Sequence, residues 1–346
     1  MSIAKTNYGI MPSGEEVFAY EIKNNLVTAS IVTLGAALNK LLVKDKSGNF
    51  RDVLLGFDNL HDRLSYSDYH GVTVGQYCNR IKGGKFMLCG KLFNVEKNEN
   101  NITCLHGAGE YSSALWKAKE IDDKSVCFTY LSPDMNNGFP GSVENRVTYT
   151  LSESDLIIEY DAVPDTETII NLTNHAYFNL NGYDFGTILN HTLTINADYY
   201  IPIDKYSIPT GDIASVKGTP LSFVDGKKIG KEIDADAVQL KNGQGYDHNF
   251  CINGYDGTLK TAAKVKGDES GIELTVKTTL PGIQFYSGNF LNGMKGKNNI
   301  SMERRTGFCL ETQFYPDTPN NAHFPPCVFS PEKPYKSKTV YSFSNI

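Results

Sequence analysis

Short runs of alternating apolar and polar residues recur along the whole 346-residue chain. In one such run, Leu156, Ile158 and Tyr160 fall on the same side of an extended backbone, because successive side chains of a β-strand point to opposite faces. The same pattern predicts further strands within 16–42 and at 126–130, 146–152, 192–198, 272–277 and 338–343.

Turn signals separate these runs, and long helical periodicity is absent. Lys46-Ser47-Gly48-Asn49 predicts a hairpin turn, residues 58–66 leave room for one short helical turn, and 201–242 reads as long loops with one short helix. No repeat or linker divides the chain. We therefore expect an all-β fold, a large twisted antiparallel β-sandwich, with residues 1–346 forming a single domain.

Composition narrows the classes of partner. The net charge is −6 with mixed signs and no basic cluster, which argues against nucleic acid or membrane binding. The first residues lack an apolar signal core, and the seven cysteines show no Cys-x-x-Cys spacing. These features predict reduced, mostly buried thiols in a cytoplasmic protein.

A carboxylate interrupts an otherwise apolar predicted strand at 307–317. Phe308, Leu310 and Thr312 share one face, and Cys309, Glu311 and Gln313 share the other. A buried ionised glutamate is costly unless another group pairs with it or the chemistry uses it. A structural ion pair and a catalytic role are both open for Glu311 at this point.

A second predicted strand, 169–180, has an unusual polar face. Thr173, His175, Tyr177 and Asn179 fall on one side, whereas the other side is apolar apart from Asn174. An exposed strand face normally carries Lys or Glu. Uncharged hydrogen-bonding groups in a row are more typical of the lining of a polar cavity.

Two further sites are weak when taken alone. Arg80 stands between apolar neighbours, so it either forms a buried ion pair or lines a polar pocket. His106 precedes Gly107 in a glycine-rich loop and is by itself more typical of a structural histidine. Gly83-Gly84 lacks the Gly-Lys-Ser/Thr ending of a phosphate loop and predicts a β-turn.

Taken together, the chain closely resembles the galactose mutarotases, the aldose 1-epimerases. Six motifs carry the resemblance and occur in the family's order, namely Asn79-Arg80-Ile81, Leu105-His106-Gly107, Asn174-His175-Ala176-Tyr177-Phe178-Asn179-Leu180, Asp247-His248, Pro281-Gly282-Ile283-Gln284 and Gly307-Phe308-Cys309-Leu310-Glu311-Thr312-Gln313. Any one motif is weak, but six in sequence are highly specific.

The resemblance implies a galactose mutarotase-like supersandwich with a sugar site in an open cleft. It implies that Glu311 is the catalytic base and His175 the catalytic acid. The substrate-binding residues that it implies are His106, Arg80 and Asp247, with Asn79, Tyr177 and Gln284 in support. The chain departs from the family pattern at Gln76, where Arg is common, and at Ala108–Ser112, and both departures bear on which sugar fits.

The implied reaction interconverts the α and β anomers of free hexoses, with D-galactose and also D-glucose as expected substrates. It needs a base at the C1 hydroxyl and an acid at the ring oxygen, so we expect Glu311 ionised and His175 protonated when the sugar is bound. No cofactor is needed, and no metal-ligand spacing is present. The expected partner is a free aldohexose, and the expected assembly is a monomer or homodimer.

Three other functions remain as alternatives. A glycoside hydrolase could use Asp247 and Glu311 as its carboxylate pair. A sugar-phosphate epimerase would need more cations than Arg80 at the pocket. A non-catalytic sugar-sensing module would keep the pocket but lose Glu311 or His175, and both are present.

Overall fold

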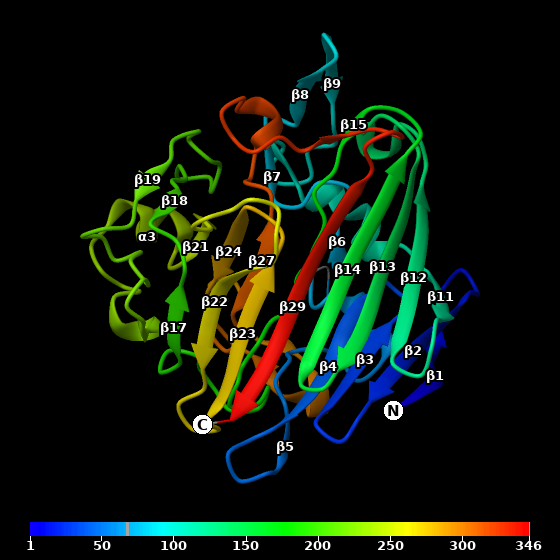
Figure 1. Ribbon diagram of the computed structural model, residues 1–346, viewed down its shortest axis with the longest axis vertical. Helices are drawn as coiled ribbons and strands as arrows, with labels where there is room; N and C mark the ends of the chain where they lie inside the picture. Colours follow the sequence, from blue (N-terminus) through cyan, green and yellow to red (C-terminus); the bar gives the residue numbers. More distant parts are fainter. Residues whose placement is uncertain (67–68, 346) are drawn as a thin grey trace.

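The computed structural model describes residues 1–66 and 69–345, and antiparallel sheets dominate it (Figure 1). The N-terminal sheet has the strand order β1-β2-β3-β4-β5. Its strands are β1 (Ser2–Ile10), β2 (Glu16–Lys23), β3 (Val27–Val32), β4 (Ala37–Lys44) and β5 (Phe50–Asp52).

The largest sheet has nine strands in the order β11-β12-β13-β14-β29-β23-β22-β17-β20. They are β11 (Lys117–Glu120), β12 (Ser125–Ser132), β13 (Val143–Ser152), β14 (Asp155–Pro164), β17 (Thr192–Ile195), β20 (Lys227–Lys228), β22 (Lys260–Lys266), β23 (Ile272–Thr278) and β29 (Tyr335–Asn345). Figure 1 shows β29 in the middle, between β14 and β23, so it joins two halves that are distant in the sequence.

A third sheet, in the order β19-β18-β21-β24-β27, carries much of the polar cleft described below. Its strands are β18 (Tyr199–Ile201), β19 (Ala214–Ser215), β21 (Asp247–Cys251), β24 (Gly282–Tyr286) and β27 (Cys309–Gln313). Five two-stranded pairs complete the set, namely β6 (Thr73–Val74) with β16 (Thr173–Asn174), β7 (Arg80–Lys82) with β10 (Thr103–Leu105), β8 (Lys85–Leu88) with β9 (Lys91–Asn94), β15 (Thr168–Ile169) with β28 (Val328–Phe329), and β25 (Met294–Lys295) with β26 (Ser301–Met302).

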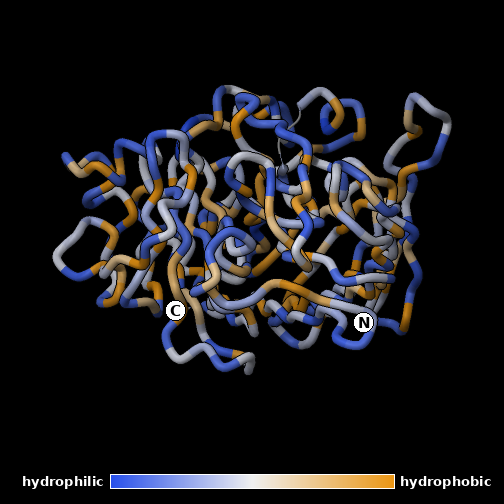
Figure 2. Tube along the Cα trace, turned by 90° about the horizontal axis from the view of Figure 1, so that it is seen from above, coloured by the Kyte–Doolittle hydropathy of each residue, from blue (hydrophilic) through white to orange (hydrophobic). Residues whose placement is uncertain are grey.

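The helices are short, as expected from the sequence. They are α1 (Leu60–Ser65), α2 (Glu110–Ser113) and α3 (Val238–Gly243). Figure 2 shows short hydrophobic segments alternating with hydrophilic ones along the trace. Within the two described ranges of the chain, no helix is long and apolar enough to cross a membrane.

The nine-stranded sheet packs on the other two, which makes the predicted sandwich. Tyr20 of β2 contacts Phe128 of β12 edge to face, with ring centroids 6.0 Å apart. On the other half, Thr312 of β27 bonds Thr339 of β29 through their hydroxyls, at 2.6 Å. Alternation therefore predicted the faces correctly: Leu310 and Thr312 enter the core, and Glu311 points away from it.

The predicted strand at 169–180 is not continuous. It is broken into β15, β16 and isolated bridges at Asn171 and Phe178. The backbone stays extended, but its partners change: the Gly71 amide donates to the His175 carbonyl, the Leu55 amide donates to the Tyr177 carbonyl, and Phe178 pairs with Phe308. The segment crosses between layers, so no one strand accompanies it throughout.

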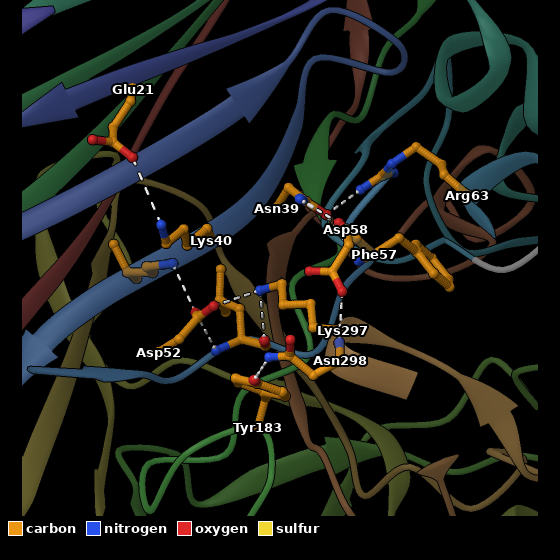
Figure 3. A network of polar contacts seen from close by, with 12 residues as sticks. Glu21, Asn39, Lys40, Asp52, Phe57, Asp58, Arg63, Tyr183, Lys297 and Asn298 are labelled. Carbon is orange, nitrogen blue, oxygen red and sulfur yellow. Dashed lines mark hydrogen bonds and ion pairs between the residues drawn. The ribbon is translucent and has the colours of Figure 1, made fainter. Parts of the chain in front are cut away.

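A buried ion pair joins the N-terminal sheet to the β25–β26 hairpin (Figure 3). Lys297 donates to Asp52 at 2.7 Å and to the Leu54 carbonyl at 3.0 Å. The other Asp52 oxygen accepts from the backbone amide of Leu41 at 3.0 Å. Because both charged side chains are over nine-tenths buried, each depends on the other for compensation.

Replacing Lys297 with Met should lower the free energy of unfolding by about 3–5 kcal/mol, because Asp52 would keep a buried charge without its partner. Urea unfolding at neutral pH measures this difference. Lys40→Met is the matched control, since its 3.8 Å pair with Glu21 is 40% and 37% exposed and should cost no more than about 1 kcal/mol. Equal losses of unfolding free energy in the two variants would contradict a stabilising role for the Lys297–Asp52 ion pair.

Candidate active site

A polar cleft of ≈ 390 Å³ opens where β7, β21, β24 and β27 meet the 175–177 segment. Its size suits a small ligand. Its lining includes Asn79, Arg80, His106, His175, Tyr177, Asp247 and Glu311. The structure thus brings together seven of the eight predicted site residues, and the eighth, Gln284, lies just behind the wall.

Glu311 occupies the centre of β27 and is 2% exposed. Its Oε1 atom lies 3.7 Å from His175 Nε2, and its Oε2 atom has no hydrogen-bond partner among the residues that the structure describes. Burial raises the pKa of Glu311 well above the usual value, and the nearby Asp247 raises that pKa further, against an opposing effect of Arg80. A carboxyl group with these properties holds a proton readily.

His175 faces Glu311 from the segment after β16. Burial lowers the pKa of His175 to about 4, although a hydrogen bond to its own backbone opposes the shift. Its Nδ1 atom lies 3.5 Å from the sulfur of Cys309. The rings of Tyr69 and Tyr177 lie at centroid distances of 5.7 and 5.0 Å and fix the plane of the imidazole.

His106 begins a turn whose residues have left-handed backbone conformations. Residues 106–109 all have positive φ, between 54° and 80°. At Gly107 an added Cβ would approach the Gly75 carbonyl oxygen to 2.1 Å, so no larger residue fits there. Two hydrogen bonds join His106 to Asn79. The His106 backbone amide donates to the Asn79 backbone carbonyl, and the Asn79 backbone amide donates to His106 Nδ1, both at 3.1 Å.

The second bond fixes the tautomer of His106. Because Nδ1 accepts a hydrogen bond, the ring proton resides on Nε2. Burial, with the charges of His175 and Arg80, holds the pKa of His106 well below the ordinary value. His106 is therefore a neutral group that presents a fixed N–H donor.

An ion pair and a hydrogen-bonded carboxyl group frame the remaining wall. Arg80 forms a two-pronged ion pair with Glu99, through Nε and one terminal nitrogen, each at 2.8 Å. Gln284 donates to Asp247 at 2.7 Å, and burial raises the pKa of Asp247 while Arg80 opposes that rise. Both suggestions for Arg80 are correct, because it is in an ion pair and also lines the pocket.

Sequence reasoning missed several residues of the cleft. Glu99 lies in a polar loop without any local signal, and Tyr69 is isolated from every motif; the ring of Tyr69 packs 4.5 Å from that of His106. The additional lining residues are Tyr69, Glu99, Asn100, Leu105, Lys205, Tyr206, Ser207, Asn242, Gln244, Tyr286 and Phe290. Residues 205–207 lie in the predicted long loops. Their succession of a charged, an aromatic and a hydroxyl side chain was the sequence signal that could have indicated a binding site.

The two departures from the family pattern lie outside the described lining. Gln76 is buried in the core and donates to the Thr168 hydroxyl at 2.9 Å and the Ile169 carbonyl at 3.0 Å. In the 108–112 segment, Glu110 is buried and accepts from Ser132 at 2.6 Å. Neither departure supplies a side chain to the cleft wall, so any effect on the choice of sugar is indirect.

Three potential metal ligands converge in the cleft, namely His106, His175 and Glu311, whose ligand atoms lie within 4.8 Å of one another. A histidine binds a metal through a nitrogen lone pair. The cleft-facing nitrogen of His106 carries the proton instead, because the Asn79 amide occupies Nδ1. A metal ion at Nε2 would force the ring proton onto Nδ1 and break the hydrogen bond from the Asn79 backbone amide. These three residues therefore fit a metal ion poorly.

The fold and the cleft together define an acid–base enzyme that takes a small polar ligand. The chain matches the aldose 1-epimerase family over residues 19–342. It is 38% identical to galactose mutarotase from Bos taurus and 38% identical to that from Homo sapiens, in each case over 99% of both chains. The structure of galactose 1-epimerase from Lactobacillus acidophilus superposes with a TM-score of 0.87 at 26% identity, covering 99% of both chains.

The chain belongs to the aldose 1-epimerase family. It is an isomerase that interconverts the anomers of free aldoses, and the family resemblance read from its sequence is confirmed.

The tautomer of His106 is directly measurable. At neutral pH, ¹⁵N-resolved NMR of the imidazole nitrogens should show His106 protonated at Nε2 and bare at Nδ1, because the Asn79 amide donates to Nδ1. His248 is an internal control, since its Nδ1 accepts from the Asp247 amide at 3.1 Å. A proton on Nδ1 of His106 would refute the assignment and reopen the metal-binding set.

Proposed function

We propose that the enzyme interconverts the α and β anomers of free D-galactose and D-glucose, with Glu311 as base and His175 as acid. The observation that carries the proposal is the facing pair itself, a carboxyl oxygen and an imidazole nitrogen 3.7 Å apart in a cleft open to a small ligand. All seven cysteines are free thiols, which supports the expected reducing, cytoplasmic setting. We further propose that the enzyme works as a monomer or homodimer.

The reaction balances with one proton on the pair. Glu311 takes the proton from the C1 hydroxyl while His175 gives its Nε2 proton to the ring oxygen O5, and the C1–O5 bond breaks. The open-chain aldehyde rotates about C1–C2. His175 then recovers its proton from O5 and Glu311 returns its own to the new C1 hydroxyl as the ring closes on the other face.

The two histidines take different roles because their Nδ1 atoms have different neighbours. His106 Nδ1 accepts an amide hydrogen, so protonating that nitrogen would set two donors against each other. His175 Nδ1 faces a sulfur and its own backbone, so its ring can carry two protons. His175 can therefore cycle a proton, whereas His106 acts as a constant donor to a sugar hydroxyl.

Burial refines the expected protonation states. The expectation of an ionised Glu311 and a protonated His175 applies to the sugar-bound enzyme, whereas burial favours the reverse in the free cleft, since the pKa of Glu311 is raised and that of His175 is lowered to about 4. In the free cleft the single proton resides mainly on Glu311. The C1 hydroxyl, by donating to the carboxylate, favours the ionic form when sugar binds.

The same burial assists ring opening. In the open-chain state Glu311 has gained a proton and His175 has lost one, so both are neutral. These are the forms that a low-dielectric site favours. The cleft therefore stabilises the step in which the C1–O5 bond breaks more than it stabilises the bound ring, which is what catalysis requires.

The positioning residues complete the proposal. Arg80, held by Glu99, offers a rigid guanidinium edge to sugar hydroxyls. Asp247, oriented by Gln284, accepts from hydroxyls at the other end of the cleft. Asn79 sets the His106 turn, and Tyr177 packs against the ring of His175 and lines the wall.

The alternatives receive less support. A glycoside hydrolase mechanism would leave His175, which faces Glu311, without a role. A sugar-phosphate epimerase would need several cations at the pocket, whereas both prongs of Arg80 engage Glu99, which leaves Lys205 as the other Lys or Arg side chain in the described lining. A sensing module would not need the acid–base pair that the cleft contains.

Glu311→Gln should abolish turnover while the fold is retained, because an amide cannot accept the C1 proton. Polarimetry on freshly dissolved α-D-galactose, corrected for the rate without protein, should show kcat at least about 100-fold lower. Glu159→Gln changes an exposed side chain of the nine-stranded sheet, so it serves as the control and should keep full activity. A folded Glu311→Gln enzyme with more than about a tenth of the normal kcat would rule out the base assignment.

The pH profile of kcat/KM should be a bell, because the pair must carry one proton. Below about pH 4, His175 takes a second proton; at high pH, Glu311 loses the one it holds, well above its ordinary pKa of 4.5. The limits belong to the coupled pair. Polarimetric rates across pH, with circular dichroism to confirm folding at each point, provide the test. An acid limb at the ordinary histidine pKa of 6.5 would contradict this order.

A further inference from the structure

Cys309 is the immediate neighbour of His175 on the side away from Glu311. It lies at the start of β27, two residues before Glu311, so both side chains point from the same face of one strand. Its sulfur lies 3.5 Å from His175 Nδ1, and the thiol is fully buried. Strand β27 therefore carries both Glu311 and the cysteine that contacts His175 on the other side of its ring.

The thiol stays neutral in this position. Burial raises the pKa of Cys309 well above the usual value of 9.0, and the carboxyl groups of Glu311 and Asp247 raise it further. A neutral thiol is a weak acceptor and cannot form an ion pair with an imidazolium. It can orient the ring without stabilising the ring's positive charge strongly.

That distinction matters for an acid. A carboxylate behind a histidine makes the imidazole more basic, and so a weaker proton donor. A sulfur acceptor keeps the proton on Nδ1 in the neutral ring, which leaves the Nε2 lone pair facing Glu311. The same contact preserves the acidity of the imidazolium.

We propose that Cys309 is a positioning residue for His175: its sulfur accepts the Nδ1 hydrogen, aims Nε2 at the reacting atoms, and keeps the imidazolium a strong acid. This inference rests on the proposed function. The side chain of Cys309 is not part of the described cleft lining, so it would act through His175.

The other groups around His175 are fixed by their own contacts. Glu311 faces Nε2 from β27, and the ring of His106 lies edge-on at 5.3 Å from its turn. The Tyr69 and Tyr177 rings cover the imidazole, and His70 stacks behind Tyr177 at 4.4 Å. A change at Cys309 alters the side chain that faces Nδ1 and leaves each of these groups, and the hydrogen bond of His175 to its own backbone, in place.

The test compares Cys309→Ala and Cys309→Ser with the unmodified enzyme, by polarimetric kcat, KM and the pH profile. Cys309→Ala should lower kcat by about 10-fold, as is typical when a histidine loses its supporting partner, with KM changed less than about twofold. Its acid limb should move to lower pH, because the imidazolium loses an acceptor. Cys309→Ser should recover part of kcat and move the acid limb to higher pH, since a hydroxyl oxygen is the stronger acceptor.

Cys327→Ala is the matched control. It removes a buried core thiol outside the cleft lining, so kcat and the pH limits should stay as in the unmodified enzyme. The proposal is overturned if Cys309→Ala keeps kcat within about twofold, or if Ala and Ser variants lose activity equally with an unshifted acid limb, which is the result of packing alone. His175→Asn, measured in parallel, separates the two levels. If that variant stays active, the acid assignment itself fails; if it is inactive while Cys309→Ala is unaffected, only the positioning role fails.

Discussion

The burial of Glu311 without a direct counter-charge is the constraint on which the site depends. The nearest cation, Arg80, is already engaged by Glu99, and the nearest carboxylate, Asp247, adds repulsion. The carboxyl group therefore prefers its neutral form, with its Oε1 atom 3.7 Å from His175 Nε2. In the proposed mechanism, a salt bridge at Glu311 would stabilise the carboxylate and weaken it as a base, so the lack of a direct counter-charge favours the reaction.

The surrounding architecture maintains this unfavourable arrangement. β27 is hydrogen-bonded to β24 on one side, and its core-facing residues pack on β29 of the nine-stranded sheet. The left-handed turn at 106–109 is stabilised by the Asn79 pairing and by the close contact at Gly107. These elements contribute the stability that allows a buried acid–base pair and a strained turn to persist.

Much of the fold could be predicted because alternation reports burial directly. The face of Glu311 and the meander of β12, β13 and β14 followed from period two alone. The broken course of 169–180 did not, because its backbone partners come from four separate segments, 53–55, 71–78, Phe308 and 327–329. For the site, the family resemblance named eight residues, seven of which line one cleft, yet it could not reveal Glu99 beside Arg80, or that Gln284 lies outside the cleft lining. The pKa directions in the free cleft could not be predicted either, since they depend on how completely each group is removed from water.

The central place of β29 has a consequence for how the chain folds during synthesis. β14 leaves the ribosome long before β29, and until β29 arrives the edge of β14 exposes a long row of unpaired backbone groups. β27, which carries Glu311, also emerges late. Until β29 is synthesised, β14 presents an open, aggregation-prone edge, and residues 309–345 then supply both β27, with Glu311, and the strand that closes that edge.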